Sequence, residues 1–246
     1  MSKYNLIGVG SNAKTIKGDG SEYVTGILYM TPWKISVKGK LYNSCAMAEQ
    51  ASCVDGCLHT AGRAGIIKTG ESTNTILAAR ERKAQLFYAD RDAFMDLLIK
   101  DVAKFIKECA KTGAQPCIRL NGTTDIRWEL ILVNGKNIFE HFPQVQWYDY
   151  TKIANRKVSH IKNYHLTWSY SQANPAYAKM LDTALAQGMN VAVVFRNKLK
   201  PDTFKGLPVI DGDKDDLRFL DPKGVVVGLY AKGKAKKDAS GFVVDA

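Results

Sequence analysis

The stretch YHLTWSYSQANPAYAKMLDTALAQGMNVAVVF, residues 164–195, contains the pattern of a strand, a helix and a second strand in direct succession. Residues 164–170 and 190–195 are short runs rich in β-branched, aromatic and other apolar residues, which favour strands. Residues 174–188 begin with an Asn-Pro pair and end at a glycine, as helices commonly do. Two strands joined through a helix indicate parallel pairing, so this stretch predicts a parallel sheet covered by helices.

The same alternation continues on both sides of this stretch. Further strand-like runs occur at residues 116–122, 145–151 and 224–231. Two helices are expected before them, at residues 72–89 and 90–113. The second of these helices carries apolar residues at steps of three and four, which predicts one buried face.

The number of strands predicts how the sheet is built. Residues 1–42 contain alternating runs broken by Gly and Pro, which indicate short strands. One of these strands and the five later ones would make six β/α units. We therefore predict an α/β fold, a partial (β/α)6 TIM-type barrel with a short N-terminal β extension over residues 1–42. Because no internal repeat or linker divides the sequence, we expect a single domain over residues 1–246.

Composition and charge narrow the class of protein. No apolar run is long enough to span a bilayer, and the N-terminus lacks the apolar region of a signal peptide, so we expect a cytoplasmic protein that makes no membrane contact. The formal net charge is +11, with basic clusters at residues 196–200 and 232–237. No helix-turn-helix, zinc-finger or RNA-binding signature accompanies this charge. We therefore expect at most weak binding of polyanions through counterion release.

Three of the five cysteines lie in CAMAEQASCVDGC, residues 45–57. In a reducing compartment, clustered cysteines are more often metal ligands than disulfides. The spacing of Cys45, Cys53 and Cys57 differs from that of common zinc sites, but His59 could complete a zinc site, so zinc stays an alternative. A glycine-flanked loop with three thiolates also suits a 4Fe–4S cluster that leaves one iron open. We predict the cluster, with residues 43–65 as its binding loop.

The expected partners of such a cluster are polar residues at the ends of the strands. In β/α barrels the chemistry gathers at the carboxyl ends of the strands. Polar and aromatic side chains follow almost every strand-like run here. The candidate catalytic residues are Tyr150, Lys152 and Arg196. The candidate cofactor-binding residues are Asn121, Thr123, Thr124, Asp125, Trp168 and Ser169.

A strand followed by a three-cysteine loop, a helix and parallel β/α units resembles the radical S-adenosylmethionine superfamily, although the cysteine spacing differs. The sequence more closely resembles phage-encoded proteins of the "gene product 88" kind, in CAMAEQASCVDGC (45–57), CIRLNGTTD (117–125), WYDYTK (147–152) and NVAVVF (190–195). This resemblance implies a radical-SAM-type barrel with a 4Fe–4S cluster, and host cytoplasm as the location. It leaves open whether S-adenosylmethionine binds, because the family's glycine–glycine–glutamate strand end is replaced here by residues 121–125.

Three functions are compatible with an open iron. The iron could pass one electron, as in reductive cleavage of S-adenosylmethionine, and the protein would then be a radical enzyme. It could instead act as a Lewis acid in hydrolysis or elimination, for example on esters, with Tyr150, Lys152 or Arg196 stabilising charge. A third alternative is a binding protein that the cluster merely stabilises. We expect an enzyme that acts on a small-molecule substrate at the open iron.

Overall fold

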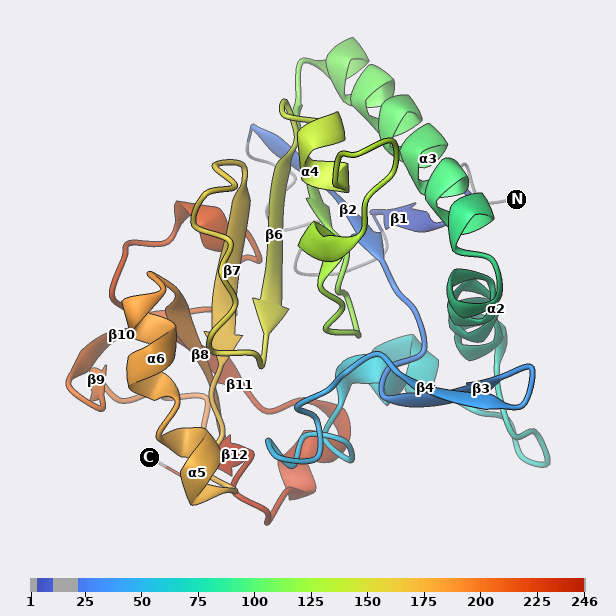
Figure 1. The fold of residues 1–246 in the computed structure, drawn as a ribbon. Helices are drawn as coiled ribbons and strands as arrows, with labels where there is room; N and C mark the ends of the chain where they lie inside the picture. Colours follow the sequence, from blue (N-terminus) through green and yellow to red (C-terminus); the bar gives the residue numbers. More distant parts are fainter. Residues whose placement is uncertain (1–3, 11–21, 246) are drawn as a thin grey trace.

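A computed structural model describes residues 4–10 and 22–245 of the chain (Figure 1). One large sheet dominates the fold, and its strands lie in the spatial order β1-β2-β5-β6-β7-β8-β11-β10-β9, with β12 beside the end of β8. The strands of this sheet are β1 (Ile7–Val9), β2 (Tyr23–Leu28), β5 (Gln115–Arg119), β6 (Gln146–Thr151), β7 (Tyr164–Ser169), β8 (Asn190–Phe195), β9 (Thr203–Phe204), β10 (Leu207–Asp211), β11 (Val226–Tyr230) and β12 (Val243–Val244).

The central strands pair in parallel, as the sequence predicts. From β2 to β11 they follow one another in chain order, except that β10 is added outside β11. The two edge strands, β1 and β9, run antiparallel to their neighbours. A second, two-stranded sheet consists of β3 (Lys34–Val37) and β4 (Lys40–Asn43).

The prediction of a partial (β/α)6 TIM-type barrel of radical-SAM kind is wrong. Among the described residues, β1 and β9 do not pair with each other, so the ten-stranded sheet does not close. Helices also fail to alternate with the strands. Residues 152–163, which join β6 to β7, contain only turns, and β9 and β10 occupy the connection from β8 to β11. The sequence pattern predicted parallel pairing, but closure depends on the edge strands, which it does not determine.

The helices are unevenly distributed along the chain. The longest are α2 (Thr75–Ala89) and α3 (Arg91–Thr112), which confirm the two helices predicted before β5, and Figure 1 shows α3 beside β1 and α2 beside β3. The helix predicted between β7 and β8 is split in two. The remaining helical segments are α4 (Ile138–His141), α5 (Pro175–Ala178), α6 (Leu181–Ala186), η1 (Leu58–Thr60), η2 (Gly62–Gly65), η3 (Trp128–Leu130), η4 (Arg218–Leu220) and η5 (Gly233–Lys237).

The core lies between α3 and the sheet. The apolar stripe of α3 is buried, and its members Phe94, Leu98 and Val102 have no exposed surface. The ring of Phe94 lies 5.1 Å from that of Phe87 on α2, centroid to centroid. Asp101 is the polar exception on this buried face. Its carboxylate accepts hydrogen bonds from the amides of Leu6 (2.6 Å) and Ile7 (3.3 Å), which fastens the first edge strand to the helix.

The cysteine-bearing loop lies at the carboxyl ends of the parallel strands. Figure 1 shows the chain after β4 passing below the tips of β6 and β7. The hydrogen bonds agree with this view, because the amide of Asp125, in the loop after β5, donates to the carbonyl of Ser44 at 2.8 Å. The thiol of Cys45 lies 3.8 Å from the carbonyl oxygen of Thr123. The fold therefore places the cysteines beside the strand ends where the sequence predicts the site.

Candidate functional site

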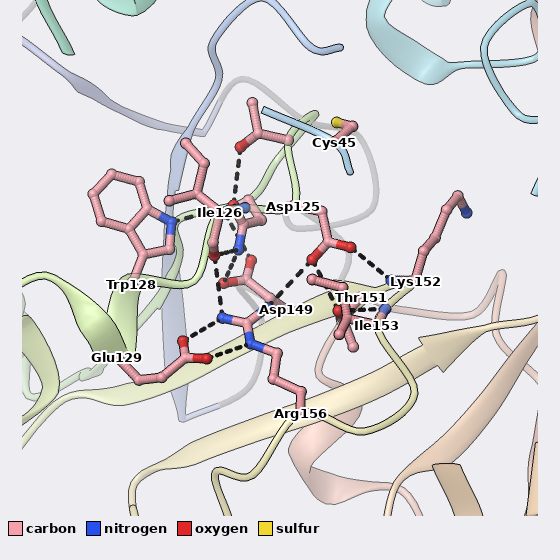
Figure 2. A network of polar contacts seen from close by, with 12 residues as sticks. Cys45, Asp125, Ile126, Trp128, Glu129, Asp149, Thr151, Lys152, Ile153 and Arg156 are labelled. Atoms are coloured by element: carbon pink, nitrogen blue, oxygen red, sulfur yellow. Dashed lines mark hydrogen bonds and ion pairs between the residues drawn. The ribbon is translucent and has the colours of Figure 1, made fainter. Parts of the chain in front are cut away.

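Asn121 organises the chain that leaves β5, of which Figure 2 shows Asp125, Ile126 and Trp128. Its side-chain oxygen accepts hydrogen bonds from the Thr124 hydroxyl (2.9 Å), the Ile126 amide (2.9 Å) and the Trp128 indole (3.1 Å). Its side-chain nitrogen donates to the carbonyl of Ile126 at 3.0 Å. Both ends of the Asn121 amide are therefore used within the protein, and the residue shapes the loop that carries Thr123, Thr124 and Asp125.

Arg156 joins this loop to the connection after β6. Its guanidinium lies 3.3 Å from an oxygen of Asp125 and 2.6 Å from one of Glu129, and its side chain is only 1% exposed. It also donates to the hydroxyl of Tyr164 at 3.0 Å. Burial alone would lower the pKa of Arg156, but Tyr164 and the two carboxylates raise it above its ordinary range. The guanidinium therefore stays charged, as the two buried carboxylates require.

Asp125 is held on two further sides. One oxygen accepts from the hydroxyl of Thr151 (2.8 Å) and the other from the amide of Lys152 (2.8 Å). Burial raises the pKa of Asp125, while Arg156 and these hydrogen bonds oppose the rise. The carboxylate thereby fixes the end of β6, from which the side chain of Lys152 extends.

Asp149 makes the stability of the fold depend on pH. Burial raises its pKa to about 7, against the opposing effects of Arg119 and the Asn121 amide. The ordinary value is 3.8, so the folded chain holds a proton there that the unfolded chain releases. The stability that this bound proton contributes is fully present below pH 4 and is lost as the pH rises through about 7.

We therefore expect Asp149→Asn to remove part of the pH dependence of unfolding. The free energy of unfolding of the variant, relative to that of the wild type, should increase by roughly 1–3 kcal/mol from pH 5 to pH 8, because the amide cannot ionise. Urea unfolding at both pH values measures this difference. Asp96→Asn, at an exposed position of α3, serves as the control and should show no such gain. If pH affected the unfolding of the wild type and of Asp149→Asn equally, the raised pKa of Asp149 would be contradicted.

The three loop cysteines differ in exposure but influence one another. Cys53 is buried, whereas Cys45 and Cys57 are half-buried. Burial raises the pKa of Cys45 to about 12, with Asp125 and Cys57 adding to the rise. Burial also raises the pKa of Cys57, and its Coulombic neighbours include Cys53. Cys57 is thus within electrostatic reach of both other thiols, and in the metal-free chain Cys45 and Cys57 are protonated at neutral pH.

The donor set can be compared with two kinds of metal site. Over residues 4–10 and 22–245, no three His, Cys, Asp or Glu side chains are grouped closely enough to hold a single metal ion. A 4Fe–4S cluster separates its thiolates by the width of its iron–sulfide core, so it takes a wider set of thiols. Cysteine sulfur is its standard ligand. Among the described residues, Cys45, Cys53 and Cys57 therefore match a cluster in residue type and in their common loop only.

Two cationic side chains act electrostatically on the thiol of Cys57. The charges of Lys152 and Arg80 both lower the pKa of its thiol. His59, the residue proposed as a fourth ligand for zinc, lies beside Arg80, and one ring nitrogen is 3.4 Å from the guanidinium. Burial and Arg80 together lower the pKa of His59 to about 4, so its ring is neutral at physiological pH.

The other predicted site residues are divided between three places. Ser169 and Trp168 contact Lys152: the Ser169 hydroxyl accepts from its ammonium at 3.0 Å, and the Trp168 indole donates to its carbonyl at 3.2 Å. Tyr150 instead points to Asp216, to which its hydroxyl donates at 3.4 Å. Arg196 is occupied by an ion pair with Asp245 near the C-terminus. The structure thus brings Lys152 to the cysteines but leaves Tyr150 and Arg196 with other partners.

Sequence reasoning missed several charged residues of this region. Arg80 lies on α2, where the sequence pattern indicates only an ordinary polar helix face. Arg119 on β5 forms a buried ion pair with Asp216 at 2.6 Å, although the two residues are far apart in sequence. Arg156 and Glu129 lie in connections whose path the sequence does not predict. A charged residue inside an apolar strand, as Arg119 is, was the one available signal, since such a group requires a partner.

A cleft of about 800 Å³ lies next to the cysteine loop. Its wall is formed by the first turn of that loop, the junction of α2 and α3, the chain after β5 and part of α6. Ser44 and Ala46 line it on either side of Cys45, but among the described lining residues there is no cysteine. The cleft therefore borders the residues on either side of Cys45.

Membrane-spanning character and similarity to known proteins complete the description. No helix in the described ranges has the length and apolar character needed to cross a membrane. The family model described as "Gene product 88" matches residues 5–246. Neither the curated proteins nor the solved structures contain a match.

Proposed function

The chain belongs to the gene product 88 family, and on this premise we propose that it is an iron–sulfur protein that acts on a small molecule. Cys45, Cys53 and Cys57 would hold a 4Fe–4S cluster, and one iron would have no protein ligand. The observation that carries the proposal is the position of the three thiols. They share one short loop at the carboxyl ends of the parallel strands, and Cys57 is electrostatically coupled to the other two.

The surroundings of the thiols support this proposal. Because Cys45 and Cys57 have raised pKa values, they would release protons when metal binds, and loading would be favoured by higher pH. Lys152 and Arg80 would offset part of the negative charge of the thiolates. When bound, such a cluster supplies electron transfer or Lewis acidity at its open iron. The chain itself would position a substrate beside Cys57 through Lys152, whose backbone Asp125 fixes.

The family name suggests a phage-type protein. On that basis we place its activity in the cytoplasm of the infected host, where thiols stay reduced and clusters can be assembled. This setting agrees with the cysteines of the described chain, which form no disulfide.

Anaerobic purification followed by iron and sulfide analysis tests the proposal. We expect about four irons and about four sulfides per chain, and a spin-resonance signal after reduction. A colourless protein, or one that carries zinc in place of iron, would contradict it.

The same preparation distinguishes the reactions. A change of the signal on addition of S-adenosylmethionine, with formation of 5′-deoxyadenosine, would identify a radical enzyme. An unchanged signal together with hydrolysis of simple esters without reductant would identify Lewis-acid chemistry. If neither activity is found in an iron-loaded protein, the part of the proposal that assigns a catalytic role is wrong.

A further inference from the structure

Two basic side chains from different elements are anchored to the residues that flank Cys57. Arg80, on α2, donates to the carbonyl of His59 at 2.5 Å, and the amide of His59 donates to the sulfur of Cys57 at 3.4 Å. Lys152, just after β6, lies with its ammonium 5.2 Å from the ring of Phe242. That ring covers Gly56, since a Cβ built on the glycine would lie 3.0 Å from it. Both cations therefore border the same thiol.

Lys152 has no acidic partner of its own. Its ammonium donates to the neutral hydroxyl of Ser169, and within the described ranges it lies in no ion pair. Figure 2 shows its side chain extending away from the polar network around Asp125. The charge of Lys152 lowers the pKa of Asp125, but the Asp125 carboxylate is already paired with Arg156. The positive charge at the end of β6 is thus not neutralised locally.

Arg80 likewise retains an unused hydrogen-bond donor. Its guanidinium stacks over the ring of Tyr29 at 4.7 Å and contacts His59, but neither neighbour is a carboxylate. Its Nε is buried and has no hydrogen-bond partner in the described part of the chain. A buried donor without an acceptor is costly, so this nitrogen has an unused capacity to donate to an oxyanion.

We propose that Arg80 and Lys152 form a subsite for an anionic group of the substrate, a carboxylate or a phosphate. Arginine presents donors in a planar fork that suits either oxyanion, and lysine adds a compact charge. The subsite rests on the proposed function, because it places the anionic group beside Cys57, one of the three thiols that would hold the cluster. It goes further in naming the chemical class of the substrate.

Calorimetric titration of the anaerobically purified chain tests this subsite. Inorganic phosphate is used in one series and succinate in another, which distinguishes the two oxyanions. The variants are Arg80→Gln, Lys152→Gln and the double variant, with Lys152→Arg to restore the charge. Lys157→Gln, at an exposed position of the same connection, is the matched control. Iron and sulfide are measured in every sample.

We expect at least one of the two anions to bind saturably to the wild type. Each glutamine variant should bind it about tenfold more weakly, as the loss of one charged hydrogen bond predicts, while Lys152→Arg and Lys157→Gln should bind nearly as well as the wild type. Binding that is undetectable in the wild type, or unchanged in the double variant, would overturn the inference. The inference would also be overturned if the glutamine variants lost iron but bound the anion as well as the wild type does. Arg80 and Lys152 would then only balance the charge of the cluster.

The iron analysis separates this inference from the function on which it rests. If the wild type binds the anion through Arg80 and Lys152 but contains no iron or sulfide, the subsite stands and the cluster proposal fails. If iron is present and neither anion binds, the cluster proposal stands and the subsite fails.

Discussion

Replacing Arg156 with Met is expected to lower the free energy of unfolding by about 3–5 kcal/mol, the usual cost of removing one partner from a buried ion pair. The guanidinium is nearly inaccessible and is the ion-pair partner of two carboxylates, Asp125 and Glu129, whose side chains are only 7% and 8% exposed. Methionine fills a similar volume but supplies no charge and no donor. Both buried carboxylates would then lose their cationic partner, and the carbonyl of Ile126 and the hydroxyl of Tyr164 would each lose a contact.

Urea unfolding of the wild type and Arg156→Met measures this loss, and Lys157→Met, at the next and exposed position, is the control. The deficit should shrink as the pH falls, since burial raises the pKa of Asp125 and its protonation removes an unpaired charge. Arg156→Lys should lie between the two, because lysine restores the charge but not the planar set of donors. A loss below about 1 kcal/mol would show that the network contributes no more than an exposed ion pair does.

Arg156 also illustrates what the sequence could not reveal about the site. Asp125 and Thr151 could be predicted as neighbours, because Asp125 lies in the loop after β5, Thr151 ends β6, and adjacent parallel strands end at one edge of the sheet. Arg156 reaches this edge from a connection without helix or strand, and its acidic partners lie 27 and 31 positions earlier. No local pattern in the sequence relates residues at such separations. The hydrogen bonds that shape the site were therefore visible only in the structure.

The fold shows the same division between local and long-range information. The parallel strands were predictable because each run carries its own pattern, and α3 because its apolar stripe repeats over several turns. The barrel was predicted by counting units, but the count treats every connection as equivalent. Between β8 and β11 the chain forms β9 and β10 instead of a helix, and β1 pairs antiparallel at the opposite edge. Whether a sheet closes depends on such edges.

The cysteine loop was found because its residue types are unusual and closely spaced. Its cationic neighbours were harder to find. Lys152 was predicted from its place after a strand, whereas Arg80 lies on α2 among residues that form an ordinary mixed helix face. Its role follows from the way α2 packs beside η2 and the chain around His59, which is a tertiary property. Residue chemistry thus predicted the candidate ligands, and packing identified their partners.

Serine substitution of Cys45, Cys53 or Cys57 is expected to reduce the iron content from about four per chain to less than about one in each case. The hydroxyl of serine is harder and far less acidic than a thiol, so it replaces a cluster ligand poorly. Anaerobic purification with iron and sulfide analysis measures the loss, and circular dichroism of each variant establishes whether the chain has folded. We expect the folded chain to persist in the variants of the half-buried Cys45 and Cys57.

Cys109 and Cys117 provide the controls, because they have the same chemistry in a different environment. Cys109 lies on the buried face of α3, and the thiol of Cys117 on β5 is 3.2 Å from the hydroxyl of Thr25. Alanine at either position should cost stability but leave iron in the folded fraction unchanged. Equal loss of iron in all five variants would mean that metal retention follows the stability of the fold. Full iron content in the three loop variants would remove these thiols as ligands, and with them the reason to place chemistry at this edge of the sheet.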